Sequence, residues 1–295
     1  MGKVYECGWY LVIYLDVLGQ SKKLKQFKHL PTNPIENDNL IKIERETAGF
    51  IVDFRNFFDD IFNALKNTDN LLNSIPIEKH NLVKTLLENK ITSRGISDSY
   101  VMTLPLAENE SIGRSGVMYN VWAALGATCA SFIWALAKGS AIRGGIDIGP
   151  GTILPIGNHD EVYGLAVVNA VDLEKRIAQY PRVAMGENLW QYLYQAEQSP
   201  ANNNIINIAK KYAIICKNLI YQDHDGVHTL DSFGKEIFAL ENVLNKQLVG
   251  IAYKWVVQEH EKYVKSMDNK LAGKYFLLRQ YIESRLPIWN ISIIK

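Results

Sequence analysis

Two aspartates in this sequence stand where an apolar run ends or begins, and such carboxylates could bind a metal ion. Asp16 directly follows the run YLVIYL of residues 10–15. Asp98 is separated by one serine from the run YVMTLPL of residues 100–106. An ionised carboxylate at the mouth of a buried strand is costly unless hydrogen bonds or a cation compensate it. Asp98 therefore needs a partner that neutralises its charge.

The order of the predicted elements indicates how these two aspartates would meet. The hydrophobic periodicity predicts strand, helix, strand, strand, helix, strand, helix and strand in turn. These elements span residues 10–19, 48–67, 91–97, 100–106, 115–137, 140–149, 165–180 and 182–185. The order is typical of an α+β fold with a ferredoxin-like core, whose central antiparallel sheet is flanked by helices. The first and third strands of such a core are neighbours, so Asp16 and Asp98 would converge at one end of the sheet.

Shorter signals complete the predicted fold. The polar stretch 30–47 contains PTNP and predicts a loop. Adjacent glycines in the strand 140–149 predict a close approach by another backbone. Asp225-Gly226 predicts a hairpin turn, and residues 233–284 have the periodicity of two amphipathic helices.

Composition and charge exclude several classes of function. The chain has 295 residues and a net charge of +1, so it lacks the basic surface of a nucleic-acid-binding protein. Cys7, Cys129 and Cys216 are few and widely spaced, which predicts reduced thiols in a cytoplasmic protein. Residues 115–137 carry no charge and could cross a bilayer, but the many small and polar residues among them favour a buried core helix. We expect no nucleic-acid partner and no membrane.

A divalent cation is one solution to the placement of two carboxylates at one sheet end. Two bare carboxylates there would repel each other and shift their pKa values. A cation with oxygen ligands removes the repulsion and suits a triphosphate substrate. The alternative is that each carboxylate caps a turn or a helix independently of the other.

Four segments resemble the motifs of class III nucleotidyl cyclases, in the family's order. They are YLDVLGQS, GISDSYVM, IRGGIDIGPG and EVYGLAVVNAVDLEKRI, and the resemblance covers about residues 9–185. A closer resemblance is to the pyrimidine cyclases of the bacterial Pycsar antiphage systems, whose further motifs match residues 164–166, 170–174 and 180–183. The resemblance implies a cyclase catalytic domain over residues 1–200. Residues 201–295 would form a C-terminal extension of hairpin and helices that packs on this core.

The resemblance also implies roles for individual residues. Asp16 and Asp98 match the metal ligands, and the Val17 carbonyl is a further candidate ligand. The metal would be two ions of Mn²⁺ or Mg²⁺ per site.

The turn after the first strand matches a phosphate-binding segment. Its backbone N–H groups, at Val17, Leu18, Gly19 and Gln20, would face phosphate at a turn and helix start.

Two further positions match those where the family reads the nucleobase. They are Arg94 and Glu161. A guanidinium offers only donors, which suits the acceptor atoms of a pyrimidine. The alternatives are an arginine on the surface of a hairpin and an exposed turn residue.

The sequence departs from the family at the pair that contacts the ribose and the transition state. The positions that align with this pair hold Val168 and Asp172. Asn169 and Arg176 are seven residues apart, hence on one face of an α-helix, and they could take these roles in a shifted register. Alternatively, Asn169 is a capping or buried residue and Arg176 is solvated. Arg143 is a further candidate phosphate contact, or an arginine at a strand end paired with Glu or Asp.

The resemblance implies a homodimeric uridylate cyclase that converts UTP to 3′,5′-cyclic UMP and pyrophosphate. Its product would be a second messenger that activates a separate cyclic-nucleotide effector during phage infection. CTP is the alternative pyrimidine substrate, and a purine cyclase with shifted helper residues is a second alternative. A degenerate, non-catalytic module that senses nucleotide is the third.

Overall fold

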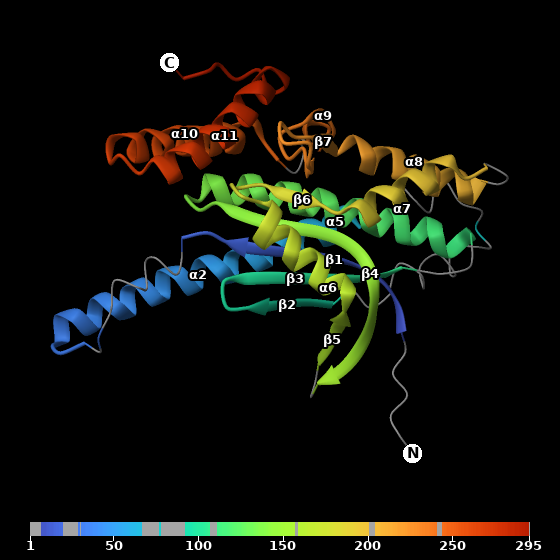
Figure 1. The fold of residues 1–295 in the computed structure, drawn as a ribbon, viewed down its shortest axis with the longest axis horizontal. Coiled ribbons are helices and arrows are strands. Elements are labelled where there is room, and N and C mark those ends of the chain that lie inside the picture. The colour runs from blue at the N-terminus through green and yellow to red at the C-terminus, as the bar shows by residue number, and fades with distance from the viewer. Residues whose placement is uncertain are drawn as a thin grey trace.

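A central sheet organises the molecule (Figure 1). The computed structural model describes residues 7–19, 29, 31–66, 77, 92–106, 111–156, 159–200, 204–240 and 244–294. The strands are β1 (Cys7–Val17), β2 (Thr92–Ile96), β3 (Ser99–Leu106), β4 (Ile142–Ile156), β5 (His159–Gly164), β6 (Val183–Met185), β7 (Ile220–Gln222) and β8 (His228–Leu230). They pair in the order β2-β3-β1-β4-β6-β8-β7, and β5 pairs with β4.

The first half of this sheet confirms the predicted ferredoxin-like core. Its four strands lie in the order β4-β1-β3-β2, and helices α2 (Pro34–Leu65) and α5 (Ser111–Ala137) connect β1 to β2 and β3 to β4. The sheet as a whole is mixed rather than antiparallel, because β6 pairs with β4 in parallel. The parallel step arises because the chain returns through helix α6 (Leu165–Asp172) before it enters β6.

Helix α2 begins fourteen residues earlier than the sequence predicts, so the predicted loop 30–47 is wrong over most of its length. The stretch PTNP is a helix start, because Pro34 occupies the first turn and the Asn33 side chain accepts a hydrogen bond from the Glu36 amide. Glu36 in return accepts hydrogen bonds from the amide and hydroxyl of Thr32. Proline and asparagine favour a helix N-terminus as strongly as they favour a loop.

Different helices pack on the two faces of the sheet. Leu11, Ile13 and Leu15 of β1 join the large core formed with α2 and α5. Tyr10 and Val12 of β1 instead contact α6, which lies on the viewer's side of the strands in Figure 1. Side chains alternate along a strand. Tyr14 and Asp16 therefore belong to the face that carries α6.

The predicted close approach to the glycine-rich strand is confirmed. A Cβ added at Gly145 would lie 2.0 Å from the Ala170 carbonyl oxygen, and one at Gly149 would lie 2.8 Å from the Ala166 amide. The absence of side chains at these positions lets α6 lie directly on β4. After Asp172 the chain continues as one π-helical turn, η2 (Leu173–Ile177).

The apolar helix α5 is the core helix that the sequence predicts. It is the one helix among the described residues that is long and apolar enough to cross a membrane, and 83% of its most apolar window is buried inside the protein. Cys129 in this helix and Cys216 are buried free thiols, and Cys7 is an exposed one.

The chain after β6 adds helices and extends the same sheet by two strands. Its helices are α7 (Glu187–Gln198), α8 (Asn204–Asn218), α9 (Lys235–Phe238), α10 (Lys246–Lys265) and α11 (Asn269–Arg285), followed by the 3₁₀ turn η3 (Leu286–Trp289). The hairpin of β7 and β8 turns at Asp225-Gly226 as predicted, with a positive φ at Gly226, and β8 pairs with β6. Helices α10 and α11 contact each other, and α10 contacts α5 (Figure 1).

Candidate functional site

The structure brings Asp16 and Asp98 together at the end of the central strands. Asp16 pairs with Ser99 in the β1–β3 register. The Val17 amide donates a hydrogen bond to the Asp98 carbonyl oxygen over 3.2 Å. Asp98 itself lies in the two-residue turn between β2 and β3, next to Ser97, whose φ is 56°.

The Asp16 carboxylate lies in an unfavourable environment for its charge. Burial raises the pKa of Asp16, and the nearby charge of Asp98 raises it further. The Ser99 hydroxyl, which donates to Asp16 Oδ1 over 3.2 Å, and the Arg143 guanidinium, 3.7 Å from Oδ2, lower this pKa only in part. A partly compensated carboxylate next to a second one is an arrangement that a divalent cation could stabilise.

Tyr14 extends the polar network on the same sheet face. Its hydroxyl lies 2.8 Å from the Ser99 hydroxyl, which itself contacts Asp16. Burial raises the pKa of Tyr14, and the charges of Asp16, Glu174 and Asp98 raise it further. All three carboxylates therefore surround one short segment of β1.

Arg143 bridges two carboxylates. It pairs with Asp16 and with the buried Glu174 of the π-helical turn. Burial raises the pKa of Glu174, the Arg143 guanidinium lowers it, and the charge of Asp16 raises it again. The structure therefore places Arg143 beside the paired aspartates, with Glu174 holding it there.

The amides predicted to bind phosphate are partly committed to the sheet. Val17 donates to the Asp98 carbonyl, and Leu18 donates to the Ala141 carbonyl over 2.8 Å. These two N–H groups are not available to a phosphate in this structure, because β1 stays paired on both sides to its last residues. Gly19 has a φ of 88° at the following turn, and Gln20 lies outside the described residues.

The two positions predicted to read the base contact each other. Arg94 on β2 and Glu161 on β5 form an ion pair, and both side chains are partly exposed. The pair presents guanidinium donors and carboxylate acceptors at one place.

Asn169 is held by a buried aspartate. Its amide donates to Asp147 Oδ2 over 3.3 Å, alongside Asn188, which donates to the same oxygen over 2.9 Å. Asp147 Oδ1 accepts from the Leu189 amide in the first turn of α7, where a carboxylate stabilises a helix N-terminus. Burial raises the pKa of Asp147. Asn169 is therefore a fixed, half-buried residue on the sheet side of α6.

Arg176 does not share the surroundings of Asn169. It is 75% exposed and pairs with Asp172 over 3.4 Å. The expectation of one shared helical face assumed an unbroken α-helix, whereas the chain is π-helical from Leu173 to Ile177. The extra residue in a π-turn rotates later side chains relative to earlier ones, so the spacing of seven no longer aligns the two.

The C-terminal extension contributes a charge near this site. Burial lowers the pKa of Lys274 on α11, and the charges of Arg143 and Lys270 lower it further. The neighbouring residue Tyr275 packs on Trp255 of α10. The Trp255 ring in turn lies beside Gly139, just before β4. Helix α11 thus lies near the strand end that carries Arg143.

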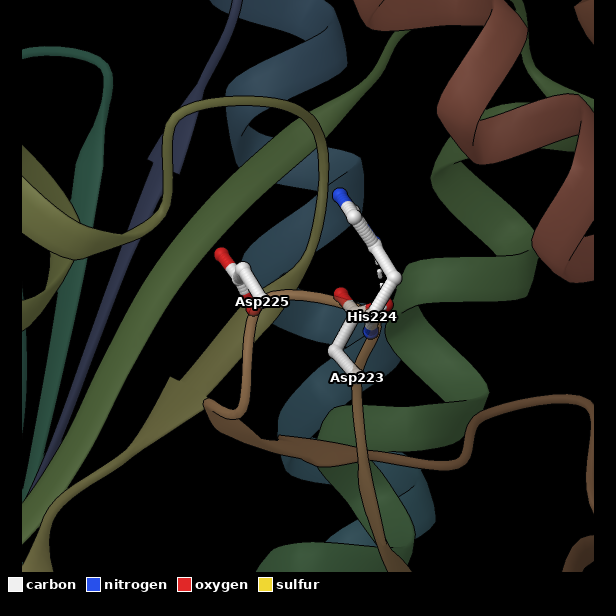
Figure 2. A group of neighbouring side chains, drawn as sticks. All are labelled: Asp223, His224 and Asp225. Carbon is white, nitrogen blue, oxygen red and sulfur yellow. Dashed lines mark hydrogen bonds and ion pairs between the residues drawn. The ribbon is translucent and has the colours of Figure 1, made fainter.

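A second acidic cluster is a structural ion-pair network. Asp223, His224 and Asp225 lie on the turn between β7 and β8 with their ligand atoms within 4.8 Å of one another (Figure 2). The buried Arg182 donates to Asp223 Oδ2 and to Asp225 Oδ2, each over 2.6 Å, and stacks on Tyr180.

Arg182 pairs with both carboxylates of this cluster and lowers their pKa values. Burial raises the pKa of Asp223, but hydrogen bonds from Tyr180, His224 and Arg182 outweigh burial and lower it. The hydrogen bond from Arg182 lowers the pKa of Asp225. The cluster therefore joins the hairpin to the residue just before β6, and the pKa values of its two carboxyls are lowered, whereas that of Asp16 is raised.

Sequence reasoning missed several residues around the aspartates. Ser99 and Tyr14 were detectable, because Ser99 follows Asp98 and Tyr14 precedes Asp16 by two, the period of one strand face. Arg55 of α2 and Lys274 of α11 carried no local signal. Arg55 donates hydrogen bonds to the Ser97 and Ser99 carbonyls on either side of Asp98, and the charge of Arg143 acts on Lys274. Only the packed fold brings these distant helices to the site.

Known proteins resemble this chain in their three-dimensional structures but not in their sequences. No protein-family model and no curated protein matches the sequence. Among solved structures, the chain is similar to a bacterial light-regulated adenylyl cyclase, with 11% identity and a TM-score of 0.35 over 83% of this chain and 59% of that one. It therefore spans less than two thirds of that protein. A second structure described in the same words has 11% identity and a TM-score of 0.35 over 84% of this chain and 99% of that one.

A fungal domain is also similar. It is the monomeric guanylyl cyclase domain of the RhoGC fusion protein from the aquatic fungus Blastocladiella emersonii. The identity is 11% and the TM-score 0.31, over 65% of this chain and 90% of that one. At such identities and TM-scores, inferences about function rest on the strand order and on the site residues instead.

The environment of Asp16 predicts that the protein is less stable when the Asp16 carboxyl is ionised. A carboxyl whose pKa is raised by folding contributes stability below its unfolded value of 3.8, and this contribution is lost as pH rises through the folded value. We expect Asp16→Asn to raise the free energy of unfolding at pH 7 in EDTA, and the advantage to vanish below pH 3.8. Urea unfolding over a pH series measures this, with the exposed Asp38→Asn as control. A less stable Asp16→Asn protein at pH 7 would contradict the prediction.

Proposed function

We propose that this protein is a nucleotidyl cyclase that converts UTP to 3′,5′-cyclic UMP and pyrophosphate. One observation carries the proposal: Asp16 and Asp98 meet at the end of the two central strands of a ferredoxin-like sheet, and the charge of Asp98 disfavours ionisation of Asp16. The sequence resemblance to class III cyclases assigns metal binding to the same two residues.

The residues at this site fit a divalent metal ion. Asp16 and Asp98 offer hard oxygen ligands, and the chain carbonyl of Val17 is next to Asp16. The partial compensation of Asp16 by Ser99 and Arg143 leaves negative charge for a cation to neutralise. Mn²⁺ or Mg²⁺ held here would lower the pKa of the ribose 3′-hydroxyl and offset the charge of the triphosphate.

The reaction joins two atoms of one nucleotide. The 3′-oxygen loses its proton and attacks the α-phosphorus, and the bond from that phosphorus to the bridging oxygen breaks in line, which releases pyrophosphate. Asp16 and Asp98 would orient the triphosphate through the metal. Arg143 and Lys274 would place positive charge near the phosphates as negative charge develops. Asn169, fixed by Asp147, and the exposed Arg176 remain the candidates for contact with the ribose and the transition state.

The Arg94–Glu161 pair supports a pyrimidine substrate. A guanidinium donates to carbonyl oxygens, which uracil carries at positions 2 and 4, and a carboxylate accepts from the uracil N3–H. Cytosine replaces the N3–H by an acceptor, although its amino group still offers a donor, so CTP is the second candidate. The resemblance to Pycsar cyclases further proposes that the cyclic nucleotide activates a separate effector during phage infection.

A head-to-tail homodimer is part of the proposal. In the cyclases that the sequence resembles, the site lies between two subunits. Large apolar side chains are exposed here on β5 and α6, which contact each other. They are Tyr163, Leu165 and Val168, of which Tyr163 is 72% exposed. Apolar surface of this kind supports an interface between copies of the chain.

The activity test uses purified protein, Mn²⁺ and each ribonucleoside triphosphate separately, with products resolved by mass. We expect cyclic UMP from UTP. Asp16→Asn and Asp98→Asn should each lower the rate by at least about 100-fold, since a catalytic metal is worth several kcal/mol. Asp38→Asn, the same change on exposed α2 surface, should keep the rate. Cyclic AMP or GMP would refute the pyrimidine assignment, and nucleotide binding without any product would favour a sensing module.

The shared site predicts complementation between inactive variants. Asp16→Asn alters the metal half of each site, and Arg94→Gln alters the base-reading half, which in the proposed head-to-tail dimer would come from the other subunit. A mixed dimer of the two variants keeps one site with both halves intact. Random mixing after refolding should therefore restore about a quarter of the wild-type rate. No recovery in dimers shown by mass to be mixed would place both halves of the site in one subunit.

A further inference from the structure

Helix α2 reaches the turn that carries Asp98 through one side chain. Arg55 Nη2 donates to the Ser97 carbonyl over 2.8 Å and to the Ser99 carbonyl over 3.2 Å. These two carbonyls flank Asp98 on either side. A single guanidinium therefore fixes the backbone before and after the aspartate.

The hairpin makes room for this guanidinium. A Cβ at Gly95 would lie 1.7 Å from Arg55 Cζ, so any other residue there would displace the arginine. The Arg55 Nε is buried and has no hydrogen-bond partner in the described part of the chain. An unpaired buried donor carries a free-energy cost, so the arrangement is not the one that stability alone would favour.

The turn itself needs to be held. Ser97 has a φ of 56°, in the left-handed region that residues other than glycine rarely adopt. One helical turn after Arg55, Asp59 accepts a hydrogen bond from the Tyr100 hydroxyl over 2.5 Å. Phe54 and Phe58 of α2 pack on the ring of Tyr100. Helix α2 thus contacts the start of β3 at two places. Asp59 and the two phenylalanines contact Tyr100, and Arg55 contacts the turn that holds Asp98.

We propose that Arg55 is a positioning residue for Asp98, which sets the separation of the Asp98 and Asp16 carboxylates and so the affinity of the site for a divalent cation. Because Arg55 belongs to α2, a displacement of this helix would move a metal ligand. This inference rests on the proposed function, since it assigns a role relative to the same pair of aspartates.

The test measures binding of Mn²⁺ alone and amide hydrogen exchange of the metal-free protein. Arg55→Ala should weaken Mn²⁺ binding by about 10–100-fold, as for other residues that orient metal ligands, and should speed exchange across residues 97–100. Gly95→Ala, which keeps the arginine but displaces it, should act in the same direction. Arg45→Ala removes an exposed arginine of the same helix and should change neither measurement.

The outcomes separate this inference from the proposed function. If Arg55→Ala and Gly95→Ala bind Mn²⁺ as the wild type does while Asp16→Asn does not, Arg55 is a structural residue and the inference is overturned. If Asp16→Asn also binds as the wild type does, the metal site itself is refuted.

In steady-state assays, the positioning role predicts a raised KM for the metal complex of UTP with a smaller change in kcat. Should Arg55→Ala fail to fold, Gly95→Ala and Arg55→Lys carry the same comparison.

Discussion

Asp16 and Asp98 repel each other at the end of the central strands, and the elements around them hold the two carboxylates in place against this repulsion. The β1–β3 pairing places Asp16 next to the turn of Asp98, and burial adds to the cost of charging Asp16. A fold gains nothing in stability from such a pair unless a cation is present. The pair therefore supports the proposed metal site, because it costs stability that a bound cation would restore.

Elements from the whole chain converge on this pair. On one side, α2 holds the Asp98 turn through Arg55. On the other, the π-helical turn supplies Glu174, which holds Arg143 beside Asp16. The glycines of β4 make this possible, because they let α6 and the π-turn lie directly on the sheet. The C-terminal helices add a lysine, and so the extension is part of the electrostatics of the site rather than a separate appendage.

The sequence was sufficient for the strand order because each central element has a clear hydrophobic period, and the strand order alone brings Asp16 near Asp98. The sequence did not predict the structure where the same short stretch of residues is compatible with two different local structures. The stretch PTNP suits a loop and a helix cap equally, and the run from Asn169 to Arg176 does not reveal its π-turn. Long-range contacts of flexible side chains, such as that of Arg55, depend on helix placement and leave no pattern in the sequence.

Electron paramagnetic resonance would show most directly whether the paired aspartates bind metal, because free Mn²⁺ gives the visible signal and bound Mn²⁺ is counted by difference. Asp16→Asn and Asp98→Asn should each lose binding. His224→Gln and Asp225→Asn, in the cluster bound by Arg182, should keep it. Binding that survives both changes at Asp16 and Asp98 but is lost with His224 or Asp225 would place the metal at the β7–β8 turn and show that the paired aspartates are not its ligands.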